Sequence, residues 1–184
     1  MNKNLFLSLI ALAVLLSASC KKVKDALQKD FDITPDAIEA TVPPVTTTDE
    51  TTVIGTFTVD MNLDSLVNSY TSQFGIGNIK SIKITSFKVA LLNANASNNI
   101  SNFESASAEI SAPGQGAKVL VQSNNIPDTY AESLTLPVTG GDIELKDYVK
   151  ATTFNYVLRG KARRTTSKEL RVKVTAQYTF TFGL

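Results

Sequence analysis

Apolar and polar residues alternate along most of the chain from residue 31 onward, which is the pattern of β-strands with one buried face. Polar turns containing Gly, Pro or Asn separate the strands at intervals of about 8–12 residues. We therefore predict a mainly β fold, an antiparallel β-sandwich (jelly-roll or immunoglobulin-like) or barrel of about 7–9 strands with one or two short helices. The alternating segments are 36–43, 56–61, 79–93, 103–112, 117–123, 132–138, 154–162 and 170–182.

The last two segments carry the clearest alternation. In 154–162 and in 170–182 one phase is apolar, and the other phase holds most of the basic residues of this region. Such strands bury one face in the core and leave the other in water. A polar stretch near 163–168 connects them, so we expect the two strands to pair as a long antiparallel hairpin.

Segment 79–93 changes phase in its middle. Its apolar residues occupy one phase before Thr85 and the other after Ser86. A phase change of this kind predicts a bulge, or a strand that leaves one sheet for another.

Two segments have helical rather than strand spacing. In 62–77 the apolar residues form one helical face as far as Phe74, with Asn62 as the expected N-cap and a glycine at the end. A shorter helical turn is expected over 142–150, with Asp142 as its cap.

Two polar stretches leave the strand pattern. Residues 31–52 contain a clean alternation over 36–43, which predicts a strand; the alternative is a disordered tether across the whole stretch. Residues 93–102 are rich in Asn and Ser and predict a surface loop. The glycosylation sequon at Asn99 matters only in a eukaryotic secretory route.

Composition excludes several classes of function. The chain has 184 residues, which favours one domain, alone or with a tether. Its 18 Lys and Arg nearly balance 17 Asp and Glu, so we expect no nucleic-acid partner. It contains no His, no Trp and one Cys, which removes histidine triads, histidine metal sites and internal disulfides. We expect no metal and no cofactor.

The N-terminal 19 residues have the organisation of an export signal. Lys3 precedes an apolar run over 5–16, which is too short to span a bilayer, and small residues at 17–19 lead into Cys20. This arrangement resembles a bacterial lipoprotein signal, which implies that the Cys20 thiol is acylated after cleavage. The alternative is an ordinary secretory signal that is cut after Ser19.

The residues after Cys20 are mostly basic. Lys21, Lys22 and Lys24 precede the first acid, Asp25. Surface-exposed lipoproteins of Bacteroidota often carry acidic residues here, so the resemblance implies the periplasmic face of the outer membrane. The expected organisation is a lipoprotein signal peptide over 1–19, a lipidated tether over 20–30 and a β-sandwich domain over 31–184.

From about residue 31 onward, the order of motifs resembles a set of small lipoproteins of Bacteroidota. The residues that carry the resemblance are IKSIKITSFKV, FESASAEISA, VLVQSNNIPD, LTLPVTGGDIELKDYVKATTFNYVLRG and the closing strand that ends in FTF. These are packing motifs. The resemblance therefore implies an all-β fold and an envelope location, and it brings no functional residues with it.

Carboxylates are the remaining acid–base groups with a useful pKa. The candidate acids are Asp128, Glu132, Asp142, Glu144 and Asp147, which form no recognisable catalytic pattern. No EF-hand calcium loop is present in the sequence. We therefore expect that the protein is not an enzyme.

The densest charge lies in residues 159–173, which hold one acid, Glu169, among seven basic residues. These are Arg159, Lys161, Arg163, Arg164, Lys168, Arg171 and Lys173. On a hairpin tip they would contact lipid headgroups, an anionic polymer or an acidic protein; the alternative is protection of a sheet edge against aggregation. Reversing Arg163, Arg164 and Lys168 is expected to weaken a contact at nearly unchanged melting temperature.

Three hypotheses for function follow. The first is a non-catalytic, lipid-anchored cell-envelope protein that acts as a structural or accessory binding module at the outer membrane. The second is a carrier for a hydrophobic small ligand, and the third is a carboxylate-dependent hydrolase. The carrier cavity would be lined by Phe57, Phe87, Phe154, Tyr156, Tyr178 and Phe180.

Overall fold

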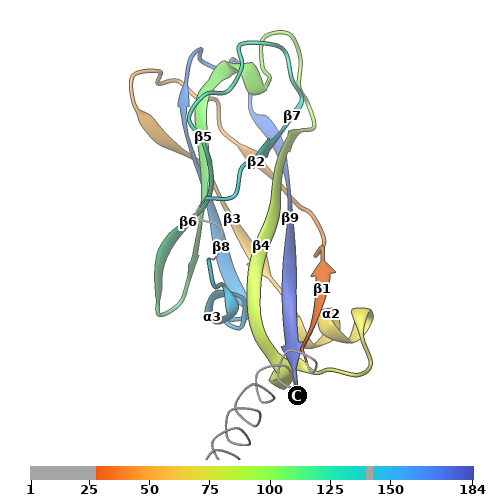
Figure 1. Cartoon of the computed structure of the whole chain (residues 1–184). Helices are drawn as coiled ribbons and strands as arrows, with labels where there is room; N and C mark the ends of the chain where they lie inside the picture. Colours follow the sequence, from red (N-terminus) through yellow and green to blue (C-terminus); the bar gives the residue numbers. More distant parts are fainter. Residues whose placement is uncertain (1–27, 140–142) are drawn as a thin grey trace, which may run out of the picture.

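A computed structural model of the chain describes residues 28–139 and 143–184. Segment 1–19, Cys20 and the expected cap Asp142 lie outside these residues. Two antiparallel sheets pack face to face (Figure 1), so the predicted β-sandwich is confirmed. Among the described residues, no helix is long and apolar enough to cross a membrane.

The first sheet is organised around β9. Strands β1 and β2 pair one after the other with one edge of β9, β4 pairs with its other edge, and β7 extends the sheet beyond β4. The bounds are β1 (Gln28–Ile33), β2 (Ile38–Val42), β9 (Leu170–Gly183), β4 (Ile79–Leu91) and β7 (Ser133–Leu136).

The second sheet has the order β3-β8-β5-β6. Its bounds are β3 (Thr51–Asp60), β8 (Thr153–Ala162), β5 (Phe103–Ala112) and β6 (Gln115–Ser123). Two short α-helices and two 3₁₀ turns complete the described elements: α2 (Leu63–Tyr70), α3 (Lys146–Val149), η1 (Ile76–Asn78) and η2 (Ile100–Asn102).

The expected hairpin between the last two strands is wrong. β8 pairs with β3 and β5, whereas β9 pairs with strands of the other sheet. Residues 163–169 therefore carry the chain from one sheet to the other. Alternation specifies which face of a strand is buried but not which strand lies beside it. The inner faces of β8 and β9 meet across the core, where the Tyr156 and Tyr178 hydroxyls form a hydrogen bond.

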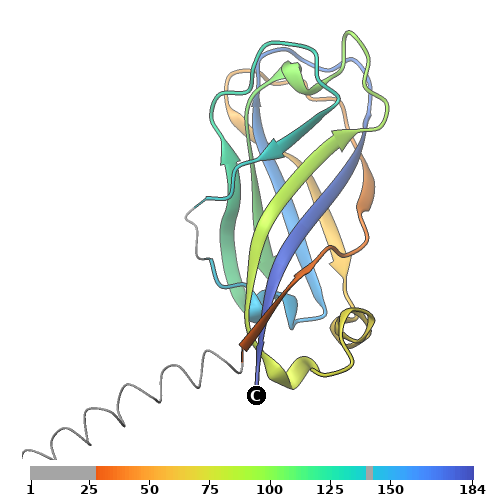
Figure 2. The ribbon, with the colours of Figure 1, turned by 45° about the vertical axis from the view of Figure 1, so that its right-hand side comes forward.

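The sandwich has two ends that β9 connects. We call them the Leu170 end and the Gly183 end. Gln28 pairs with Gly183, so β1 begins at the Gly183 end, where η1 and α2 also lie (Figure 2). The connection 163–169 lies at the Leu170 end, because β8 finishes and β9 starts there. The 14 residues of β9 separate the two ends by about 45 Å.

The strand predicted over 36–43 is confirmed, and the tether alternative for 31–52 is wrong. β2 pairs with β9 over five residues and stops before the two prolines. β1 begins at Gln28, so the sheet starts three residues before the expected domain boundary at residue 31. Backbone pairing with β9 orders both segments.

The phase change in β4 is a bulge, as predicted, because its register against β9 shifts between Ile84 and Ser86. The predicted helix is real but shorter than expected. Asn62 caps α2 by accepting a hydrogen bond from the Ser65 N–H at 2.9 Å, as predicted, yet the helix ends at Tyr70. Phe74 instead packs against the rings of Phe31 and Phe182.

Candidate functional site

The seven basic residues do not form an open patch on a hairpin. Arg159, Lys161, Arg171 and Lys173 lie on strands, on the outer faces of both sheets, and Arg163, Arg164 and Lys168 lie in the connection at the Leu170 end. Arg159 pairs with Glu109 at 3.0 Å, and Lys161 pairs with Glu104 at 3.2 Å. Cross-strand pairs of this kind support the sheet directly.

On the other sheet, Glu39 of β2 forms ion pairs with both remaining strand cations. Its carboxylate lies 3.5 Å from the Lys173 Nζ and 3.9 Å from an Arg171 Nη atom. These groups are exposed, and such pairs contribute little free energy. The Glu39 carboxylate offsets one of the two positive charges on this face.

Arg163 binds three backbone carbonyl oxygens on two segments of the chain. Its guanidinium donates to the carbonyl oxygens of Ser101 at 2.9 Å, Phe103 at 3.2 Å and Ile126 at 2.9 Å. The rigid fork of arginine suits such multiple contacts. Arg163 is therefore a structural brace at the Leu170 end rather than a free cation.

Arg164 is paired on the surface beside it. It binds both carboxylate oxygens of Asp128, at 2.6 and 3.0 Å, and also donates to Ser101. The hydrogen bond from Arg164 lowers the pKa of the Asp128 carboxyl. Asp128 thus serves as the partner of Arg164, a role that its position in a polar loop did not indicate.

The expected surface loop at 93–102 is wrong in its second half. Asn98, Asn99, Ser101 and Asn102 are buried, each at most 4% exposed. Their amides hold neighbouring loops: the Asn102 Nδ2 donates to the Ser97 and Thr165 carbonyls, and the Asn98 Oδ1 accepts from the Ser167 N–H. The side-chain amide of Asn99 is enclosed, which leaves no room for a glycan at the sequon.

Lys168 is the exception among the seven basic residues. It is exposed, and it has no carboxylate within ion-pair distance among residues 28–139 and 143–184. It borders an open groove of about 520 Å³. That groove is lined by Thr41, Pro44, Asn93, Ser167, Lys168, Glu169 and Arg171. Of the predicted contact residues, Lys168 and Arg171 are the ones brought together at a concave surface.

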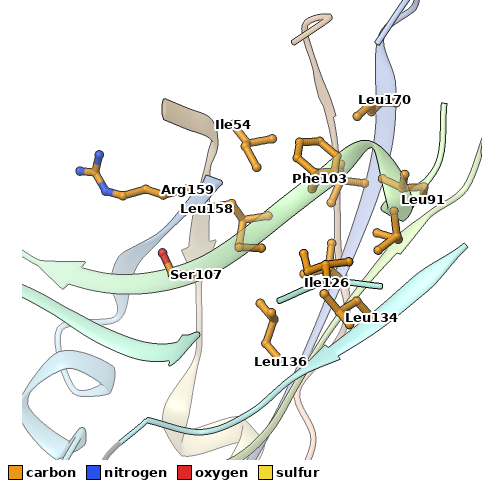
Figure 3. Close-up of a pocket in the computed structure, with 14 residues that line it drawn as sticks. Ile54, Leu91, Phe103, Ser107, Ile126, Leu134, Leu136, Leu158, Arg159 and Leu170 are labelled. Carbon is orange, nitrogen blue, oxygen red and sulfur yellow. The ribbon is translucent and has the colours of Figure 1, made fainter. Parts of the chain in front are cut away.

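The cavity expected for a hydrophobic ligand is not where the sequence suggested. All six aromatic residues are at most 2% exposed and form the packed core. An apolar cavity of about 40 Å³ lies elsewhere between the sheets, near the Leu170 end, where aliphatic side chains from both sheets converge on it (Figure 3). Its labelled lining includes Ile54, Leu91, Phe103, Ile126, Leu134, Leu158 and Leu170. Ligand pockets hold about 300–1,000 Å³, so this space is a packing gap.

Asp128, Glu132 and Glu144 have structural partners, and Asp147 lies in the first turn of α3. Burial raises the pKa of the Glu144 carboxyl, but hydrogen bonds to its carboxylate outweigh burial and lower the pKa overall; they include those from the backbone N–H groups of Ile82 at 3.0 Å and Lys146 at 2.9 Å. The Glu132 carboxylate accepts a hydrogen bond from the Tyr130 hydroxyl at 2.7 Å. A general acid needs a raised pKa, the opposite of what Asp128 and Glu144 have.

Another concave surface lies beside α2 at the Gly183 end. It is an open groove of about 810 Å³, with Asp60, Asp64 and Lys150 on its walls. Thr152 at its edge has a φ of 61°, which is rare for a β-branched residue. The Met61 N–H donates to the Thr152 carbonyl at 2.7 Å, and this contact fixes the turn. Among the described residues, no group of three or more potential metal ligands occurs.

Comparisons with known proteins give only distant structural similarities. The sequence matches no protein-family model and no curated protein. The structure of infectious bursal disease virus Gt strain aligns with 85% of this chain and 33% of that chain, at 9% identity and a TM-score of 0.37. The structure of the Gx strain of the same virus aligns with 85% of this chain and 32% of that chain, at 11% identity and a TM-score of 0.35.

A chain of Desmodium yellow mottle tymovirus aligns over 82% of this chain and 83% of its own length, at 9% identity and a TM-score of 0.22. This chain spans about a third of the length of the two bursal disease virus chains. TM-scores this low support no inference about function.

Proposed function

We propose that the protein is a non-catalytic, lipid-anchored envelope protein, held by Cys20 to the periplasmic face of the outer membrane, with the β-sandwich as a structural or accessory binding module. The observation that carries the proposal is the N-terminal pattern: a cation, a 12-residue apolar run, three small residues and then the chain's single cysteine. Several acyl chains on one residue would give stable anchoring.

The position of β1 supports this proposal. Seven residues lie between Cys20 and Gln28, and the eight Cα–Cα steps across them reach at most about 28 Å when extended. The sandwich would therefore stand close to the bilayer. Lys21, Lys22 and Lys24, next to the anchor, would be favoured by anionic headgroups.

A non-catalytic role is supported by the structural contacts that the charged side chains make within the fold. Asp128 pairs with Arg164, the Glu144 carboxylate accepts hydrogen bonds from backbone N–H groups, and Arg163 holds three backbone carbonyls of two chain segments. These groups hold the fold together. Lys168 and its groove at the Leu170 end offer a contact for an acidic protein or an anionic polymer of the envelope.

The anchor is tested by replacing the cysteine. In cells that process bacterial lipoproteins, wild-type protein should sediment with the outer-membrane fraction, and Cys20→Ala should appear in the soluble fraction or keep its signal segment uncleaved. Ser19→Ala, which keeps a small residue beside the cysteine, is the matched control and should stay membrane-bound. Soluble wild-type protein, cut after Ser19, would instead indicate an ordinary secretory signal.

A further inference from the structure

The Gly183 end presents apolar side chains to solvent. Ile76 is 44% exposed and Leu184 is 77% exposed, although most large apolar residues of the sandwich are buried. The start of β1, the η1 turn and the end of β9 meet at this end, because Gln28 pairs with Gly183 and Ile79 pairs with Phe182 (Figures 1 and 2).

The turn that carries Ile76 is braced. The Gly75 N–H donates to the Asn78 Oδ1 at 3.0 Å, and the Asn78 N–H returns a hydrogen bond to the Gly75 carbonyl at 2.9 Å. The Asn78 Nδ2 then donates to the Gly183 carbonyl at 3.4 Å, which ties the turn to β9. Ile76 is thus held outward by a fixed turn.

Two lysines flank this apolar tip. The Lys80 side chain lies across Gly183, and the Gln28 side chain lies on its other side. Lys29 extends over the Phe31 ring, with its Nζ 5.0 Å from the ring centroid. Within residues 28–139 and 143–184, neither lysine has a carboxylate within ion-pair distance.

The two lysines lie on opposite faces of the sheet. Lys29 pairs with Phe182 and shares its face, whereas Lys80 lies over Gly183 on the face that Asp30 and Asp32 also occupy. The Asp32 carboxylate accepts a hydrogen bond from the Thr179 hydroxyl, and both acids follow Gln28 along β1, away from the Gly183 end. The tip therefore combines exposed aliphatic groups with one lysine on each face of the sheet.

We propose that this tip is a lipid-contact surface, in which Ile76 and Leu184 enter the headgroup region of an anionic bilayer and Lys29 and Lys80 pair with lipid phosphates. The proposal rests on the proposed anchoring through Cys20. A seven-residue connection between Cys20 and Gln28 would bring this end, and not the Leu170 end about 45 Å away, next to the membrane. Each lysine near an anionic membrane surface raises the binding constant for that surface by about fivefold.

The test uses the full-length lipidated protein on vesicles of phosphatidylethanolamine and phosphatidylglycerol. Acylation consumes the only native thiol, so Ile76→Cys provides a single labelling site for an environment-sensitive fluorophore. Ala96→Cys, exposed at the Leu170 end, is the matched control. Spin-labelled lipids should quench the fluorophore at position 76 severalfold more strongly than the one at position 96.

The lysines are tested in the same assay. Lys29→Glu with Lys80→Glu should reduce quenching at position 76, and wild-type quenching should fall when phosphatidylglycerol is omitted. Protein that floats with the vesicles but shows equal, weak quenching at both positions would overturn the lipid-contact surface and leave the anchor intact. Wild-type protein that fails to float would overturn the anchor itself, and this surface with it.

Discussion

At the scale of single residues, the least expected feature is a pair of phenols in the core. Tyr156 is 2% exposed and Tyr178 is fully buried, and their hydroxyls bind each other. Phe87, Phe154 and Phe180 pack edge-on against their rings. Burial raises the pKa of both phenols. Alternation identified both positions as core but gave no sign that they meet across the two sheets.

We expect the losses of unfolding free energy from replacing the two tyrosines to be non-additive in a double-mutant cycle. Tyr156→Phe or Tyr178→Phe alone leaves one buried hydroxyl without its partner, which should lower the free energy of unfolding by about 1–3 kcal/mol. Replacing both removes the unsatisfied group and should restore most of that loss. Urea titration measures this, with the exposed Tyr70→Phe as control. Additive losses in the double variant would contradict the coupling.

Alkaline pH tests the same pair independently. Because the folded-state pKa of each phenol is raised, the contribution of the pair is fully present below about pH 10, the ordinary tyrosine pKa. Above it, the unfolded chain releases protons that the folded chain keeps, so stability falls as pH rises. The Tyr156→Phe/Tyr178→Phe variant should show a shallower fall than wild type.

At the scale of elements, β8 packs tightly at one glycine. A Cβ on Gly160 would lie 2.6 Å from the Ile54 Cδ1 and 2.8 Å from the Ser105 carbonyl oxygen. Gly160→Ala should therefore cost about 1–3 kcal/mol of unfolding free energy. Gly116→Ala, which meets no atom within 4 Å, should be near neutral. Ile54→Val should rescue Gly160→Ala in part; no rescue would place the strain on the Ser105 carbonyl.

We expect replacement of two cations in the connection between the sheets, Arg163 and Lys168, to have different effects on stability. Arg163→Lys cannot reach the three carbonyls that the guanidinium binds and should lower unfolding free energy by about 2 kcal/mol. Lys168→Ala should change it by less than about 0.5 kcal/mol. This revises the expectation that reversing Arg163, Arg164 and Lys168 together leaves the melting temperature unchanged. Equal denaturation midpoints for wild type and Arg163→Lys would refute the bracing role.

The elements also show how much of the fold can be predicted from the sequence. Alternation predicted β2 to β9 and the bulge in β4, and residue type predicted the cap of α2, because these depend on local periodicity and local hydrogen bonds. β1 was not predicted, because part of it lies in the expected tether over 20–30. Alternation could not predict that 163–169 crosses between the sheets, since pairing partners depend on the whole topology. Asn98 and Asn102 look exposed by residue type, yet they are buried because nearby backbone groups satisfy their amides.

At the scale of the whole molecule, the length of β9 separates two surfaces, the basic connection at one end and the apolar tip at the other. The basic connection lies at the Leu170 end, and β1 starts at the Gly183 end. Under the proposed anchoring at Cys20, the chain between Cys20 and Gln28 spans at most about 28 Å, so lipid headgroups would be a poor partner for Lys168 in an upright sandwich. An acidic protein or anionic polymer suits it better.

This separation predicts that charge reversals at the two ends have independent effects. In the full-length lipidated protein, Lys168→Glu should weaken crosslinking to an envelope partner in native membranes and leave lipid quenching at position 76 unchanged. Lys80→Glu should do the reverse, because screening limits the reach of each exposed cation to about 8 Å at physiological salt. If Lys168→Glu leaves crosslinking unchanged, Lys168 serves solubility alone. If Lys80→Glu abolishes partner capture, the partner binds at the Gly183 end and the two-surface arrangement is wrong.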